Sequence, residues 1–221
     1  MREKTWDFDR WARDYDGWVS SDSLLYARYG EVLDRVLTVA AVGPGKKVLD
    51  IGTGTGNLAL GGLKRGAVVV GLDPSEKMLG LAREKAKGLG ATAPVPTFLL
   101  VAEPFLAIPY PDSTFDAVVS TYAFHHIPQH RQPDAVREML RVLAPGGSLA
   151  MGDLIFASAE AEREALSRYE WLEEEYFARL DELAPALTQL GLTLQAEQFT
   201  PVTWVVWATK LSAGGPPLPA R

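Results

Sequence analysis

The chain has 221 residues, a formal net charge of −6 and no cysteine. Its length fits one domain with a large core. The acidic balance argues against sequence-independent binding of nucleic acid, which depends on clustered Lys and Arg, and the absence of cysteine excludes disulfides and thiolate metal sites. No apolar run reaches the roughly 18 residues of a membrane span, and the N-terminal segment lacks the apolar core of a secretory signal. We therefore expect a cytoplasmic protein that acts on small molecules.

The N-terminal segment mixes charged and aromatic side chains before any sheet pattern begins. Residues 23–41 are predicted to form a helix before the first strand. We expect residues 1–42 to form a helical lid over the site that the following segments build. Residues 1–16 should be mobile without ligand and ordered with it, as is common for segments that gate a site.

Residues 43–156 alternate short β-branched runs with longer segments of helical period. Strands are predicted at 46–51, 67–73, 97–103, 115–121 and 147–156. This alternation predicts βαβ crossovers and a doubly wound, mostly parallel α/β sheet. Ligands of such sheets bind beyond the carboxyl ends of the strands, where the strand order reverses.

Two further patterns follow this core. Residues 157–190 are predicted to form a helical insert, and residues 191–211 contain two strands joined by a short turn, which predicts an antiparallel pair. The five core strands and this pair give a seven-stranded sheet in one domain, residues 1–211. The tail, 212–221, is rich in Pro and Gly and is predicted to be disordered.

The loop after the first predicted strand indicates a ligand. In "VLDIGTGTGNLAL" the carboxylate of Asp50 precedes three alternating glycines. It would repel a pyrophosphate, and Asn57 stands where the dinucleotide pattern G-x-G-x-x-G has its third glycine. The ammonium group of S-adenosylmethionine would instead be attracted, directly or through water. The alternative is that the glycines serve only a tight turn.

Asp73 closes the second predicted strand. It lies near the roughly 20-residue offset at which an acidic residue binds ribose hydroxyls. The alternative is that Asp73 only caps the helix that follows Pro74. Its pairing with the glycine loop favours the ribose role.

Four segments resemble, in order, the successive motifs of the class I S-adenosylmethionine-dependent methyltransferases. They are "VLDIGTGTGNLAL", "GLDPSEKMLGLA", "IPYPDSTFDAVVSTYAFHHI" and "VREMLRVLAPGGSLAMGD". They are most similar to the small-molecule branch related to the ubiquinone and menaquinone biosynthesis methyltransferases, and the match runs from about residue 43 to 156. The resemblance implies the Rossmann-like methyltransferase fold, S-adenosylmethionine as cofactor and a small-molecule methyl acceptor.

The resemblance also implies individual cofactor contacts. The methionine part would be held by Asp50, Gly52, Gly54 and Gly56, the ribose by Asp73, and the adenine by Pro74 or Met78, with Thr53, Phe105 and Thr121 completing the set. Tyr15, in the N-terminal "FDRWARDYD", matches a tyrosine that closes over the cofactor in the family. The third strand departs from the family pattern, because Pro104 occupies the position of the Asp that accepts from the adenine amino group; Glu103, one position earlier, is our substitute.

All three histidines fall in "HHIPQH", after the fourth predicted strand. His126 and His130 are spaced i, i+4, but Pro128 between them and the lack of a nearby carboxylate argue against a metal site, so we predict no metal ligands. The loop is either structural or faces the substrate. If the acceptor is a hydroxyl or an acidic carbon, His125 or His126 is the candidate base; a thiolate or a free amine would need none.

The acceptor pocket should come from segments that the core motifs do not fix. Candidates are Trp11 and Trp18 near the N-terminus and Trp171 and Tyr176 in the insert, although aromatics at helical spacing also serve ordinary packing.

The sequence leaves open whether O, N, S or C is methylated, and it leaves the oligomeric state open. An alternative hypothesis is that the protein is an S-adenosylmethionine-binding sensor or partner subunit without methyl transfer. A nicotinamide reductase is a third and weaker hypothesis. The segment after Ser120 lacks an Asn-Pro-Pro-Tyr type of motif, which again disfavours nucleic acid.

Overall fold

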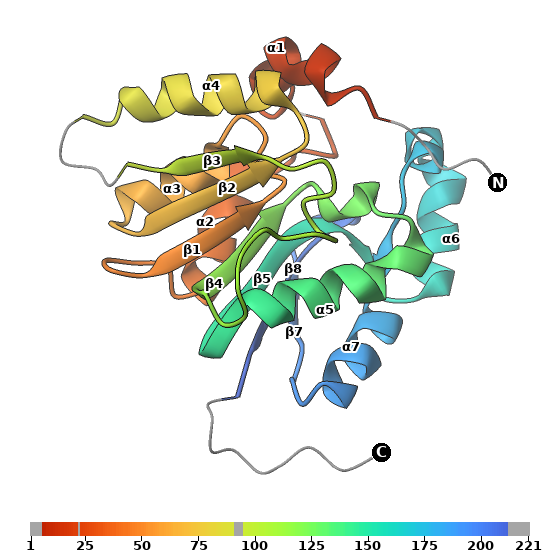
Figure 1. Cartoon of the computed structure of the whole chain (residues 1–221). Coiled ribbons are helices and arrows are strands. Elements are labelled where there is room, and N and C mark those ends of the chain that lie inside the picture. The colour runs from red at the N-terminus through yellow and green to blue at the C-terminus, as the bar shows by residue number, and fades with distance from the viewer. Residues whose placement is uncertain (1–5, 22, 91–94, 212–221) are drawn as a thin grey trace.

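The computed structural model describes residues 6–21, 23–90 and 95–211. The predicted disorder of residues 212–221 concerns residues outside these ranges, as does the start of the predicted lid, residues 1–5. Within the described residues a sheet follows the strand order β3-β2-β1-β4-β5-β8-β7, with helices on both faces (Figure 1). No described helix is long and apolar enough to cross a membrane.

The five predicted core strands are present and run parallel to one another. They are β1 (Lys47–Ile51), β2 (Val68–Asp73), β3 (Thr97–Leu100), β4 (Phe115–Thr121) and β5 (Leu143–Phe156). The predicted antiparallel pair is also confirmed: β8 (Thr203–Thr209) runs against both β5 and β7 (Gln195–Gln198). A two-residue strand, β6 (Ala178–Arg179), pairs with the end of β5 beside this path.

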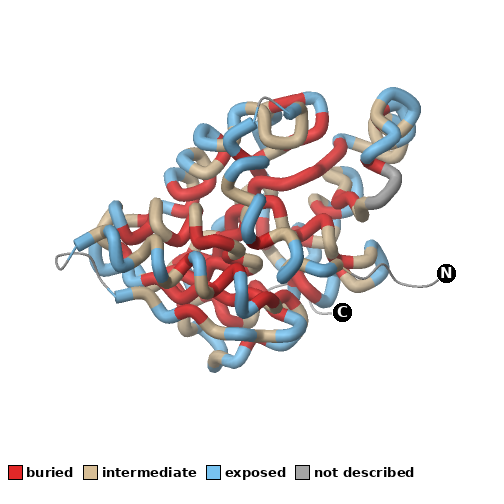
Figure 2. Tube along the Cα trace, turned by 90° about the horizontal axis from the view of Figure 1, so that it is seen from above, coloured by how far each residue is buried: buried red, intermediate tan, exposed pale blue. Residues whose placement is uncertain are grey.

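Each core strand contributes apolar side chains to both faces of the sheet, which a doubly covered parallel sheet requires. In β1, Leu49 belongs to the core cluster under α5 (Gln132–Val142) and α7 (Leu180–Gln189). Its neighbour Val48 belongs to the cluster under α2 (Tyr29–Val39), α3 (Asn57–Lys64) and α4 (Glu76–Lys87). Figure 2 shows the buried residues running through the middle of the molecule between exposed helical surfaces.

The sequence of α4 explains its position on the sheet. Ser75 caps the helix, its hydroxyl accepting from the Met78 amide at 3.1 Å, which satisfies one of the free N–H groups of the first turn. The helix also has an apolar stripe that is buried, with Leu79 and Ala82 both 0% exposed. Capping and one apolar face fix both the start of the helix and its rotation.

Two helix predictions are wrong in extent. The helix predicted at 23–41 begins only at Tyr29, after turns and a left-handed Arg28 (φ 62°). The insert predicted as helical over 157–190 is broken into α6 (Ala159–Arg168), a short 3-10 helix η3 (Glu170–Glu174), β6 and α7. In the insert, tertiary contacts override helix propensity: Leu172 and Phe177 are buried with Phe156 of β5, which draws the chain off the helical path.

The strand order reverses between β1 and β4, both of which pair side by side although β2 and β3 lie between them in sequence. The buried hydroxyl of Ser120 ties this point together by donating to the Ile51 carbonyl at 2.8 Å. The carboxyl ends of β1, β2 and β4 therefore surround one crevice, which is where an open α/β sheet binds its ligand.

Candidate active site

A cavity of about 870 Å³ opens at this crevice, within the size range of small-molecule sites. Twelve of the predicted site residues line it: Trp11, Tyr15, Trp18, Gly52, Gly54, Asp73, Pro74, Met78, Glu103, Phe105, His125 and His126. The remaining ones lie behind or away from its wall: Asp50, Thr53, Gly56, Thr121, Trp171 and Tyr176. The predicted cofactor end and the predicted acceptor end thus belong to one continuous space.

The glycine loop needs glycine for steric reasons as well as for its ligand. Gly52 has φ +70°, and a Cβ on it would lie 2.3 Å from Cβ of Ala123. Gly54 also has positive φ, but a Cβ there would meet nothing within 4 Å. The loop therefore packs tightly at Gly52 and presents open backbone at Gly54, where a ligand can approach closely.

Asp50 lies directly behind this loop and is 1% exposed. The hydroxyl of Thr53 donates to its Oδ2 at 2.7 Å, whereas its Oδ1 has no hydrogen-bond partner among the described residues. Burial raises the pKa of Asp50 to about 7. A buried carboxylate oxygen without a donor is costly, and an ammonium group would supply the missing donor and charge.

Asp73 lines the cavity at the end of β2 and is 5% exposed. Its Oδ2 accepts from the Gly54 amide at 2.8 Å and its Oδ1 from the Ser75 amide at 2.9 Å. Burial raises its pKa to about 6. Asp73 is not the cap of α4, because Ser75 holds that position. Each carboxylate oxygen keeps a further acceptor site, so Asp73 can also accept from ribose hydroxyls.

The residues after β3 and β4 form the next part of the wall. Glu103 is half-exposed at the rim, where its Oε1 accepts from Arg131 at 2.7 Å. Phe105 is buried and packs edge-on against Phe124 with ring centroids 5.6 Å apart. After Thr121 the chain turns through Tyr122, a non-glycine residue at φ 49°. Tyr122 lines the cavity, whereas Thr121 does not. Such strained backbone is common at binding sites.

The first described helix, α1 (Phe8–Trp18), covers the cofactor end and lies against α4 in Figure 1. Two carboxylates attach it. Asp9 accepts from the Ser75 hydroxyl at 2.6 Å, and Asp16 accepts from Lys85 at 2.9 Å and from the Thr55 hydroxyl at 2.7 Å. Asp9 is exposed and the ion pair between Asp16 and Lys85 is partly exposed, and exposed ion pairs contribute little to stability. These exposed polar contacts act together with the apolar packing of α1, in which Ala12 is buried.

Aromatic rings from the N-terminal segment surround His126. Its ring centroid lies 4.6 Å from that of Trp6, 5.0 Å from Phe8 and 6.5 Å from Trp11. Trp11 in turn packs edge-on against Trp18 at 6.3 Å. Burial, and secondly the neighbouring His125, lower the pKa of His126 to about 4. The imidazole of His126 is consequently neutral at physiological pH.

His125 is buried and oriented by Asp153 of β5. Its Nδ1 lies 2.5 Å from Asp153 Oδ1, and Asp153 Oδ2 accepts from the amides of Ala123 and Phe124 at 2.9 and 2.8 Å. Although burial alone would lower the pKa of His125, the Asp153 carboxylate raises it. Because Asp153 accepts at Nδ1, the neutral imidazole carries its proton there and its lone pair at Nε2.

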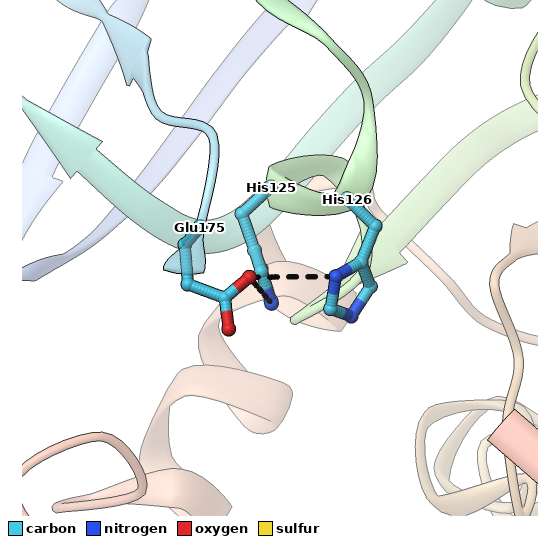
Figure 3. A group of neighbouring side chains, drawn as sticks. All are labelled: His125, His126 and Glu175. Atoms are coloured by element: carbon cyan, nitrogen blue, oxygen red, sulfur yellow. Dashed lines mark ion pairs between the residues drawn. The ribbon is translucent and has the colours of Figure 1, made fainter. Parts of the chain in front are cut away.

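Glu175 reaches this pair from the insert (Figure 3). Its Oε2 lies 3.5 Å from Nδ1 of His126 and 3.8 Å from Nε2 of His125. The expectation that no carboxylate lies near the histidines is therefore wrong. Trp171 is exposed on the surface, and Tyr176 contributes its amide, which donates to the His125 carbonyl at 3.0 Å, so neither forms the pocket wall that we predicted for them.

Sequence reasoning missed Asp153 and Glu175. A signal for Asp153 was present, since an Asp inside an apolar strand is seldom buried without a partner. Glu175 carried none, because the acidic run that contains it is typical of a solvated helix face.

The comparisons with known proteins agree with this geometry. Residues 48–147 match the model of a methyltransferase domain. An uncharacterized methyltransferase of Geobacillus kaustophilus is 32% identical over 212 residues, which cover 92% of this chain and 95% of the relative. The chain therefore belongs to the class I S-adenosylmethionine-dependent methyltransferases, and S-adenosylmethionine is its cofactor.

Solved structures show the same fold. Magnesium protoporphyrin IX methyltransferase from Synechocystis PCC 6803 with bound SAH has a TM-score of 0.74 at 21% identity, covering 92% of this chain and 96% of that one. A SAM-dependent methyltransferase from Aquifex aeolicus has a TM-score of 0.66 at 22% identity, covering 94% and 100%. The predicted fold and enzyme class are confirmed; the quinone-related branch stays a prediction.

The first prediction concerns Asp73. In Asp73→Asn, the ribose hydroxyls would lose a charged acceptor, worth about 1.5 to 3 kcal/mol. Calorimetry should show S-adenosylhomocysteine affinity falling roughly tenfold or more. Asp116→Asn is the matched control, since Asp116 also accepts a backbone amide, that of Lys47, but does not line the cavity. Unchanged affinity in Asp73→Asn would restrict Asp73 to holding the loop.

A second prediction follows from the raised pKa of Asp50, about 7. Between the unfolded value of roughly 3.9 and this folded value, the folded state binds more protons than the unfolded state, so stability falls as pH rises through this window. Without cofactor, Asp50→Asn should be more stable than the parent at pH 8, by on the order of 2 to 4 kcal/mol. The gain should shrink toward pH 4.

Urea unfolding at pH 4.5 and 8 measures this difference, and calorimetry should show that the same variant has lost cofactor binding. Asp116→Asn, at a half-exposed carboxylate, should show neither effect. A stability difference that does not change with pH would contradict a buried, ionisable Asp50.

The third prediction concerns the lid. Trypsin should cleave at Arg10 and Arg13 more slowly when S-adenosylhomocysteine is bound, and Asp16→Asn should speed cleavage of the free protein by weakening the contact with Lys85. Deleting residues 1–16 should abolish turnover and weaken cofactor binding while leaving most of the thermal stability. The control is Glu31→Gln, which removes a surface ion pair with Arg28. Equal cleavage with and without ligand would make α1 a fixed part of the fold.

Proposed function

We propose that the protein transfers the methyl group of S-adenosylmethionine to a small metabolite bound between the lid and the histidine cluster. The observation that carries this proposal is the continuity of one cavity from Gly54 and Asp73 to His125 and His126. Its volume of about 870 Å³ suits the cofactor together with a small acceptor. The cofactor would supply an already activated methyl group.

The cofactor residues are assigned by their positions. The open backbone at Gly54 and the orphan oxygen of Asp50 fit the ammonium end. Asp73 would accept from the ribose, and Pro74 and Met78 would pack on the adenine. Gly52, Thr53 and Gly56 shape the loop, Tyr15 closes over the cofactor, Phe105 and Thr121 support the adjoining wall, and Glu103 is the candidate partner of the adenine amino group.

The acceptor end has a different character. Trp11 and Trp18 line it together with Trp6 and Phe8, so it favours an acceptor with a flat or apolar body. His125, oriented by Asp153, and His126 face this end, and we assign to them the activation of the acceptor, by taking its proton or by lowering its pKa. The acidic chain, with net charge −6, supports a small molecule over nucleic acid. Its lack of cysteine supports a cytoplasmic location.

The test is methyl transfer from labelled S-adenosylmethionine into a low-mass metabolite extract. Label should appear in small molecules, and His125→Gln should lower the rate by about 10²- to 10⁴-fold with S-adenosylhomocysteine affinity unchanged. His130→Gln is the control, because His130 does not line the cavity. Label found only in protein or RNA would contradict the proposal, and cofactor binding without any transfer would favour the alternative of a non-catalytic sensor or partner subunit.

A further inference from the structure

We propose that His125, His126 and Glu175 form a binding site for a divalent transition-metal ion of the Zn²⁺ type, open toward the acceptor. The three ligand atoms come from two distant segments, the 3-10 helix η1 (Phe124–His126) after β4 and the residue that follows η3 in the insert. Figure 3 shows all three side chains converging on one point. Two imidazoles and one carboxylate are a common ligand set of catalytic zinc, which keeps a further position open.

The distances suit a shared ion better than direct contact. Glu175 Oε2 lies 3.5 and 3.8 Å from the two histidine nitrogens, and the three ligand atoms lie within 4.8 Å of one another. Those separations exceed hydrogen-bond length. Ligands held about 2.0 to 2.2 Å from a tetrahedral ion lie about 3.3 to 3.6 Å apart, so a small rotation of one ring would close the set.

The surroundings support the assignment independently. His126 Nδ1 is buried and has no hydrogen-bond partner among the described residues. His125 gives Nδ1 to Asp153 at 2.5 Å and leaves Nε2 toward Glu175. A carboxylate behind a histidine is the usual arrangement at metal sites, because it fixes the ring and the tautomer that presents the lone pair.

The open side of the site belongs to the cavity that also holds the cofactor residues, so this inference rests on the proposed function for its purpose. An acceptor with a thiol or hydroxyl would bind the ion through that atom. The S–H or O–H bond breaks, its electron pair becomes the bond to the ion, and the proton leaves to water. A coordinated thiol is deprotonated outright, which would make the acceptor a nucleophile at neutral pH beside the methyl donor.

The test begins with protein freed of metal by a chelator and then dialysed. Titration with Zn²⁺ should show one tight site, and Co²⁺ should give the visible bands of a four- or five-coordinate ion. His126→Ala and Glu175→Gln should each weaken Zn²⁺ binding at least tenfold, and Asp153→Asn by 10- to 100-fold. His130→Gln removes the remaining histidine of the chain and should bind Zn²⁺ as the parent does.

S-adenosylhomocysteine binding is measured on every variant, so a loss of Zn²⁺ binding counts only where cofactor affinity is retained. Binding of Zn²⁺ that is absent, or equally tight in Glu175→Gln, His126→Ala and the parent, overturns the metal site. Methyl transfer that survives complete removal of metal also overturns it, while leaving the methyltransferase proposal intact. Specific Zn²⁺ binding without transfer to any metabolite would instead count against the proposed function.

Discussion

The carboxylate of Asp153 is 1% exposed and accepts hydrogen bonds from the amides of Ala123, Phe124 and Leu154 and from the imidazole of His125. A buried charge is tolerated only when such donors replace water. Burial alone would raise the pKa of Asp153, but the partner imidazole and the amides lower it. This one side chain thereby fixes the loop after β4 to β5 and sets the direction of His125. The acceptor end of the cavity depends on that arrangement.

Asp50 and Asp73 are also buried, but their pKa values shift in the opposite direction from that of Asp153. Burial raises the pKa of each, to about 7 and about 6, because their donors do not offset the loss of water. The charged forms of both side chains reduce the stability of the free protein. Their presence is therefore explained by binding and not by folding. A cationic group near Asp50 and hydroxyls near Asp73 would return that free energy on binding. The carboxylates of Asp50 and Asp73 thus lower the stability of the free protein, whereas the carboxylate of Asp153 has its donors within the protein.

The sequence predicts the sheet well, because its information there is local. Alternating β-branched runs gave all five parallel strands, and Asp50 and Asp73 could be placed because a strand end fixes where the next side chain lies. The insert failed for the opposite reason: Leu172 and Phe177 leave the helical path to pack on Phe156, a contact between segments that no local pattern reports. Glu175 reaches the histidines through the same distant packing. Glu175 was therefore missed because only tertiary contacts bring it to the histidines, whereas Asp153 was missed although its place in an apolar strand was a local signal.

The two ends of the cavity differ in the same way, because one is built by the sheet and the other by segments that distant packing brings together. The residues that we propose hold the cofactor lie at strand ends and helix starts, which the doubly wound sheet positions. The acceptor end is built from the lid, with Trp6 and Trp11 around His126, and from the insert that carries Glu175. Both segments lie outside the strand and helix alternation, and the N-terminal one contacts the glycine loop through Asp16 and Thr55. If the acceptor binds at this end of the cavity, as we propose, its selection depends on the side chains of these two segments.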